Sequence, residues 1–175
     1  GPKAYSTAGW LGLTDAQIIE TIDAVKAAGL DCFKMKVGGD LGQDRERLAF
    51  IREAIGPDAL LMLDANQVWG VEEAIAHMKE LVEFRPTWIE EPTARDDVFG
   101  YKRISEALAP YNIGVACGEQ VPSPVIFKQL LESGAIQFCQ IDATRLGGVN
   151  DVLAVILMAA KYKTLVLFLK GKFSS

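Results

Sequence analysis

The stretch Phe33-Lys34-Met35-Lys36-Val37-Gly38 sets two lysines into an otherwise apolar run with the length of a buried strand. Successive side chains of a strand point to opposite faces, so Lys34 and Lys36 share one face and the apolar residues share the other. Two ammonium groups crowded on a partly buried face are expected to lower the pKa of at least one, which leaves a neutral amine able to accept a proton. The sequence therefore predicts a basic site on this strand, with an edge strand carrying two solvated lysines as the alternative.

Outward from this strand, the chain alternates between strand patterns and helix patterns. Thr14 and Gln17 have the spacing of a capping box at the start of a helix that ends near Gly29. Strands are predicted over residues 33–38, 60–66, 88–92, 113–119, 136–142 and 165–169, with a strand or extended segment over 4–12, and helices over 14–29, 44–55, 71–84, 98–108, 124–134 and 150–162. A strand and a helix recur about every 25 to 30 residues, which is the size of a βα unit.

This alternation predicts a parallel sheet, either open and doubly wound or closed as a barrel. Ionisable residues stand at the ends of five successive strands, namely Lys36, Asp64, Glu90, Glu119 and Asp142. No glycine-rich phosphate-binding loop follows the first strand, as a dinucleotide-binding fold requires. Because the carboxyl ends of barrel strands meet at one mouth, the predicted fold class is α/β, a partial (β/α) TIM-type barrel of about six to seven βα units.

The composition is that of a globular domain with an acidic balance. The chain has 175 residues, half of them apolar, and a formal net charge of −5. No cluster of lysines and arginines indicates a nucleic-acid partner, and no apolar run has the length of a membrane span. Cys32, Cys117 and Cys139 are far apart in apolar runs, which is typical of reduced core cysteines of an intracellular protein. The expected compartment is the cytoplasm, with an organelle left open because a targeting segment could precede residue 1.

Three carboxylates of the predicted mouth form a candidate metal site. Asp64, Glu90 and Glu119 fall on three adjacent strands, and carboxylates brought this close could not all ionise without a cation. Oxygen ligands of this kind suit Mg²⁺ better than zinc. Magnesium facing Lys36 would suit removal of a proton next to a carboxylate, with the metal and Lys34 stabilising the enediolate that forms. Solvated acids in loops are the alternative.

Four motifs give the chain a resemblance to a known family. Lys34-Met35-Lys36 is similar to the Lys-x-Lys motif of the mandelate racemase subgroup of the enolase superfamily, and its metal-ligand motifs resemble Asp64-Ala65-Asn66, Ile89-Glu90-Glu91-Pro92 and Gly118-Glu119. Within the subgroup the chain is similar to the L-fuconate dehydratases from about residue 4 to 162. Racemases and epimerases of carboxylates, and dehydratases of other acid sugars, share these motifs and stay open as alternatives.

The resemblance implies a magnesium-dependent hydro-lyase that acts on a small acid sugar such as L-fuconate. In such an enzyme Lys36 would remove the proton at C2, and Lys34 would help to lower the pKa of Lys36 and bind the substrate carboxylate. Loss of the C3 hydroxyl would give the 2-keto-3-deoxy acid. The metal ligands would be Asp64, Glu90 and Glu119, and Asn66 would contact the substrate.

The general acid of the family is where the resemblance fails. In the family Asp142 would orient a histidine on the seventh strand, and that histidine is expected near Leu169, where none stands. His77, the one histidine of the chain, falls within a predicted helix and is expected to be a packing or surface residue.

The ends of the resemblance set the expected domain limits. Residues 1–162 are expected to form an incomplete enolase-superfamily barrel domain without the N-terminal capping domain and the eighth strand, and residues 163–175 a divergent tail. A truncated, non-catalytic relative is therefore the alternative to an active dehydratase. An open parallel sheet exposes two strand edges, so a homo-oligomer is also left open.

Overall fold

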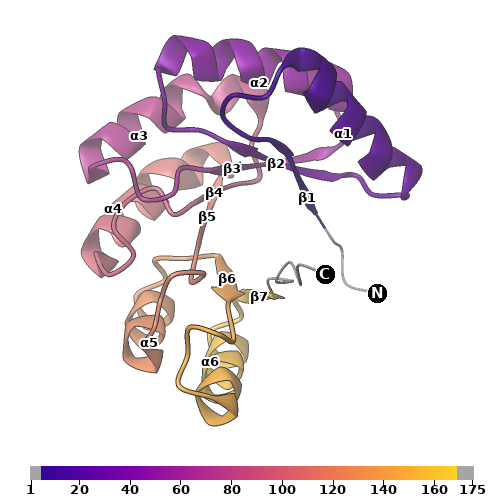
Figure 1. The fold of residues 1–175 in the computed structure, drawn as a ribbon. Coiled ribbons are helices and arrows are strands. Elements are labelled where there is room, and N and C mark those ends of the chain that lie inside the picture. Colours follow the sequence, from indigo (N-terminus) through magenta and orange to yellow (C-terminus); the bar gives the residue numbers. More distant parts are fainter. Residues whose placement is uncertain (1–4, 169–175) are drawn as a thin grey trace.

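The computed structural model describes residues 5–168, in which seven parallel strands form one curved sheet in the order β1 to β7. The strands are β1 (Ser6–Gly9), β2 (Cys32–Lys36), β3 (Leu60–Asp64), β4 (Trp88–Glu90), β5 (Gly114–Cys117), β6 (Phe138–Ile141) and β7 (Leu165–Phe168). The connecting helices are α1 (Asp15–Ala27), α2 (Leu41–Ile55), α3 (Val71–Glu80), α4 (Val98–Leu108), α5 (Pro124–Glu132) and α6 (Val149–Lys161). The sheet is a half-barrel with its helices along the outer face, as Figure 1 shows, and the partial TIM-type barrel is confirmed.

Local signals in the sequence explain where several helices begin and end. Thr14 and Gln17 form the predicted capping box at the start of α1, and Ser123 caps α5 with Pro124 in its first turn. Helix α2 begins at Leu41, three residues before the predicted start, because the Asp40 side chain accepts from the Gln43 N–H. The helix predicted over 71–84 is divided into α3 and a short 3₁₀ turn, Val82–Phe84.

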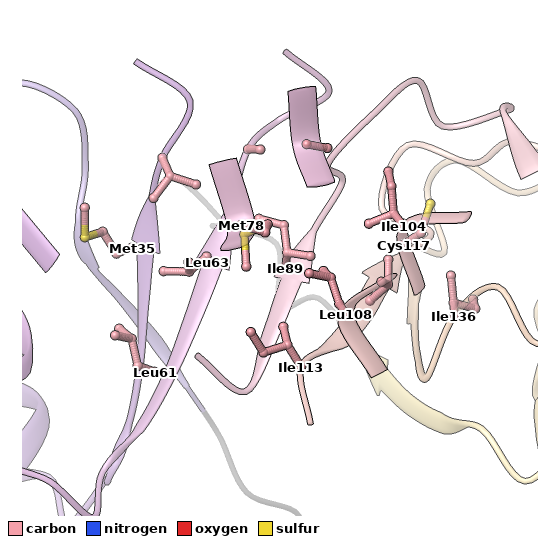
Figure 2. Close-up of a cluster of buried hydrophobic side chains, with 14 of the residues drawn as sticks. Met35, Leu61, Leu63, Met78, Ile89, Ile104, Leu108, Ile113, Cys117 and Ile136 are labelled. Carbon is pink, nitrogen blue, oxygen red and sulfur yellow. The ribbon is translucent and has the colours of Figure 1, made fainter. Parts of the chain in front are cut away.

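The outer face of the sheet carries the main hydrophobic core. Phe33, Met35 and Val37 belong to it, as the alternation of β2 predicts, and they are at most 3% exposed. Figure 2 shows Met35, Leu61, Leu63 and Ile89 with side chains from the covering helices, among them Met78 and Ile104. Burial of this apolar face against six helices supplies most of the driving force for the fold.

The inner face carries a smaller apolar cluster. This cluster contains Cys32, Met62, Trp88 and Ala116. Beside it lies a cavity of about 290 Å³, lined by Tyr5, Cys32, Leu60, Met62, Thr87, Trp88, Phe138, Leu165, Val166 and Leu167. On β2 to β4 the inner face therefore divides into an apolar end and, toward the carboxyl ends of these strands, the charged end described below.

The two edges of the sheet are β1 and β7, which do not pair with each other within residues 5–168. The three cysteines are buried and form no disulfide within residues 5–168, in agreement with the prediction of reduced core cysteines. Cys117 and Cys139 are paired in register on β5 and β6 in the outer core, whereas Cys32 lies on the inner face. Among the helices of the described part of the chain, none is long and apolar enough to cross a membrane.

Candidate active site

The register of the central strands brings the predicted site residues together. Lys36 pairs with Asp64 across β2 and β3, and Asp64 pairs with Glu90 across β3 and β4. Because all three residues end their strands and share one face, their side chains meet at the carboxyl end of the half-barrel. Lys34, two residues earlier on β2, points to the same face. Parallel pairing without a register shift at this point is what assembles the charged cluster.

Lys34 is held between two carboxylates. Its Nζ lies 2.9 Å from both Glu90 Oε1 and Oε2 and 2.9 Å from Asp64 Oδ2. The ring of Tyr5 lies on another side, with its centroid 5.4 Å from the ammonium. Lys34 is 5% exposed, so these contacts replace nearly all of its hydration.

Lys36 sits higher in the mouth and is more open to solvent. Its Nζ donates to Asp64 Oδ2 at 2.5 Å and to Asn66 Oδ1 at 2.7 Å. The indole of Trp10, which is half exposed, lies 5.3 Å from the same ammonium. An ammonium has three N–H donors, so two oxygens and an aromatic face leave Lys36 fully engaged.

Of the two crowded lysines, Lys34 does not show the lowered pKa that we expect for at least one of them. Burial acts to lower the pKa of Lys34, but the carboxylates of Glu90 and Asp64 outweigh it, and the pKa is raised above the ordinary value. The reason is the register of β2 against β3 and of β3 against β4, which brings two carboxylates to the Lys34 ammonium. The sequence pattern of β2 alone does not reveal it.

The two carboxylates of the cluster are shifted in opposite directions. Burial would raise the pKa of Asp64, but the Lys34 ammonium and then the bond from Lys36 hold it below its usual value. Burial raises the pKa of Glu90 to about 7 in spite of Lys34, and the nearby Asp64 charge adds to the rise. A cation with more than one positive charge would favour the ionised form of both.

The donor set fits a magnesium ion in its chemistry. Asp64 and Glu90 already converge on one cation, the ammonium of Lys34. Glu119 follows β5, is half-buried, and lies close enough for its charge to raise the pKa of Glu91 and Tyr5. Within residues 5–168 no group of three or more His, Cys, Asp and Glu side chains is arranged to hold a metal. Asp64, Glu90 and Glu119 are the residues that would hold a magnesium ion, and the Lys34 ammonium lies between the first two.

Asp142 and His77 lie in different parts of the structure. Asp142 follows β6 and its Oδ1 accepts from the Thr144 N–H at 2.8 Å and the Thr144 hydroxyl at 2.7 Å, which lowers the pKa of Asp142. Leu169, near which the general-acid histidine is expected, lies outside the described residues. His77, which lies in α3, packs edge-on against Trp69 with the two ring centroids 5.1 Å apart. This contact is consistent with the packing role predicted for His77.

Several residues of the site were not anticipated from the sequence. Tyr5 and Trp10 flank β1 and cover Lys34 and Lys36, and an aromatic residue at each end of the first strand was the available signal. Gln140 reaches Tyr5 from β6, with its Nε2 3.4 Å from the Tyr5 hydroxyl. Gln67 and Glu91 bond to each other beside the cluster.

Comparison with known proteins places the chain in a family. The family described as enolase C-terminal domain-like matches residues 17–169. An L-galactonate dehydratase from Hypocrea jecorina is 56% identical over 162 residues, which cover 91% of this chain and 36% of that protein.

Solved structures agree with this placement. The crystal structure of human mitochondrial enolase superfamily member 1 is 47% identical with a TM-score of 0.93, covering 97% of this chain and 38% of that one. A racemase from Streptomyces coelicolor A3(2) with bound magnesium is 31% identical with a TM-score of 0.87, covering 97% of this chain and 47% of that one. The chain thus spans less than half the length of each of these three proteins. On the family match, the sequence identity and the shared half-barrel, the chain belongs to the enolase superfamily, as a domain of the enolase C-terminal type.

Proposed function

We propose that this chain carries the proton-abstracting site of an acid-sugar dehydratase. The observation that supports this best is the position of Lys36: its Nζ lies at the mouth of the half-barrel between Asp64 Oδ2 and Asn66 Oδ1, directly above the buried pair of Lys34 and Glu90. A basic side chain beside carboxylates that can hold a cation is suited to taking a proton from the carbon next to a substrate carboxylate.

The chain's own residues then divide the work. Lys36, once deprotonated, takes the proton from C2 of the acid sugar, and Asp64 stabilises the lysine charge that results. Lys34 would release the Glu90 carboxylate and bind the substrate carboxylate in its place. Asn66, which is exposed at the rim, would contact a substrate hydroxyl. The C3 hydroxyl leaves as water after taking a proton from a general acid, which gives a 2-keto-3-deoxy acid. Magnesium held by Asp64, Glu90 and Glu119 would supply positive charge to the substrate carboxylate.

Two acids are candidate substrates. The motifs of the sequence favour L-fuconate, and the relative that is 56% identical is an L-galactonate dehydratase. These acids differ only at C6, where L-galactonate carries a hydroxyl that L-fuconate lacks. A pocket built to bond that hydroxyl would reject L-fuconate strongly, whereas an apolar pocket would discriminate weakly.

One other function is supported by a specific observation. One relative is a racemase with bound magnesium, and racemisation would use the same proton removal followed by return of a proton from a second base. The products separate these functions, because an epimer and a 2-keto-3-deoxy acid are different compounds.

The test is formation of 2-keto-3-deoxy acid from a panel that includes L-fuconate and L-galactonate, with and without magnesium, by the native chain and Lys36→Ala. The proposal predicts product that requires both magnesium and Lys36, with one of the two acids preferred. Exposed Lys128→Ala on α5 is the matched control and should leave the rate unchanged. Product that forms equally with Lys36→Ala would contradict the role given to Lys36.

A further inference from the structure

The loops that follow β3 and β4 contact each other, and both contain residues in an unfavourable backbone conformation. Asn66 and Gln67 have φ of +47° and +65°, and Glu91, which follows β4, has φ of +42°. Left-handed backbone is disfavoured for residues with a Cβ, and asparagine tolerates it better than glutamine or glutamate. Three such residues in two facing loops therefore require surrounding contacts that hold them there.

Gln67 supplies those contacts. Its backbone N–H donates to the carbonyl oxygen of Glu91 at 2.7 Å, and its side-chain Nε2 donates to Glu91 Oε2 at 3.0 Å. Its Oε1 accepts from the backbone N–H of Arg95 at 3.0 Å. Both ends of the Gln67 amide are thus engaged, which fixes the loop after β3 against the loop after β4.

Glu91 is the fixed point on the other side. It is 2% exposed, and its Oε1 is buried without a hydrogen-bond partner among the described residues. A buried carboxylate depends on its few donors, and for Glu91 these are the Gln67 side chain and the backbone N–H of Gln120. Loss of Gln67 would remove the side-chain donor of this carboxylate and free the strained loop.

The residue held by this arrangement is Asn66. Its backbone N–H donates to Asp64 Oδ1 at 3.1 Å, and its Oδ1 accepts from Lys36 Nζ at 2.7 Å. The position of Asn66 therefore fixes both the carboxylate of Asp64 and the ammonium of Lys36.

We propose that Gln67 and Glu91 are positioning residues, which clamp the loop after β3 so that Asn66 holds Lys36 and Asp64 in place. The catalytic consequence of this clamp rests on the proposed function. The effect on the position of Lys36 does not, and it can be measured without substrate.

The experiment is competitive labelling of lysines with acetic anhydride, read by mass spectrometry, on the native chain, Gln67→Met and Gln67→Gly. Methionine keeps the length of the side chain and removes its hydrogen bonds, and glycine removes them while accepting the left-handed backbone, so at least one variant should fold. Gln43→Met is the matched control, because Gln43 is exposed on α2. The rate at Lys36 is compared with that at exposed Lys128, and circular dichroism melting verifies that each variant is folded.

The clamp predicts faster labelling of Lys36, relative to Lys128, in both Gln67 variants and not in Gln43→Met. Glu91→Gln keeps an oxygen for the Gln67 amide and should label like the native chain. In activity assays the Gln67 variants should lose about 10- to 100-fold in kcat with a smaller change in KM. Losses of this size are typical when a residue that orients a metal-binding side chain is removed.

The outcomes separate this proposal from the proposed function. Labelling of Lys36 that stays at the native rate in folded Gln67 variants would overturn the clamp, as would an equal rise at every lysine or in Gln43→Met. An inactive native chain whose Gln67 variants still expose Lys36 would support the clamp and count against the dehydratase.

Discussion

The outer and inner faces of strands β2 to β4 differ sharply, although alternate residues of the same three strands form both faces. Met35, Leu63 and Ile89 on the outer face are fully buried against helices in a continuous apolar core. One residue further along β3 and β4, Asp64 and Glu90 are just as buried, but they face two lysines. Two carboxylates and two ammonium groups balance in charge, yet each had to leave water. The comparison indicates that the outer face stabilises the fold, and it supports our proposal that the inner face carries the active site.

Removing a charge from the inner face should have the largest effect. Lys34→Met leaves Asp64 and Glu90 without the ammonium between them, and a buried pair broken in this way typically costs about 3 to 5 kcal/mol. Because Glu90 can take up a proton, with its pKa at about 7, we expect a loss near the lower end of that range at neutral pH. Urea unfolding without magnesium measures it.

Magnesium sharpens this prediction. Millimolar magnesium should stabilise Lys34→Met more than the native chain, because the ammonium no longer occupies the position between the carboxylates. Lys128→Met is the control and should change stability by less than about 0.5 kcal/mol, as for other exposed substitutions. Equal free energies of unfolding for Lys34→Met and the native chain would mean that the two buried carboxylates do not need the Lys34 ammonium.

Truncations on β3 compare the two faces directly. Leu63 and Met62 are adjacent and both buried, but Leu63 lies in the closed outer core and Met62 lines the cavity of about 290 Å³. Leu63→Ala should cost about 3 kcal/mol, and Met62→Ala about 2 kcal/mol or less, because its surroundings are already incompletely filled. Chemical denaturation of both variants measures the difference, and a larger loss from Met62→Ala would reverse our assignment of the two faces.

Modification of the three cysteines is expected to affect the molecule least, and the rates of modification should follow a clear order. Burial raises the pKa of Cys139 to about 12 from an ordinary 9.0, so its thiolate fraction falls about a thousandfold. Cys117 on the same outer face is raised by burial as well, whereas Cys32 borders the cavity. Iodoacetamide should therefore modify Cys32 before Cys117 and Cys139 in the folded chain, with the three alike after unfolding. Equal rates in the folded chain would show that the outer core opens as readily as the cavity.

Much of the fold follows from patterns that act locally. The repeat of strand and helix predicts the parallel sheet, and the alternation within β2 places Lys34 and Lys36 on one face and Met35 on the other. The placement of Asp64 and Glu90 at strand ends predicts that they meet, and the register confirms it.

What the sequence does not reveal depends on contacts between strands. The partners of Lys34 are set by the register of β2 against β3 and of β3 against β4, so the raised pKa of Lys34 was not anticipated. The left-handed backbone of Gln67 and Glu91 is imposed by their mutual bonds, against their local preference. Glu119 shows the same limit, because its place after β5 does not determine its distance from Asp64.

Proton removal at C2 tests the central claim most directly, because it does not depend on departure of the C3 hydroxyl. The measurement is loss of the C2 proton signal of L-fuconate and of L-galactonate in D₂O with magnesium, followed by proton NMR, for the native chain and Lys36→Met. We predict loss of the signal with the native chain and none with Lys36→Met. A signal that persists with the native chain, or that disappears equally with Lys36→Met, would contradict the assignment of Lys36 as the base on the inner face.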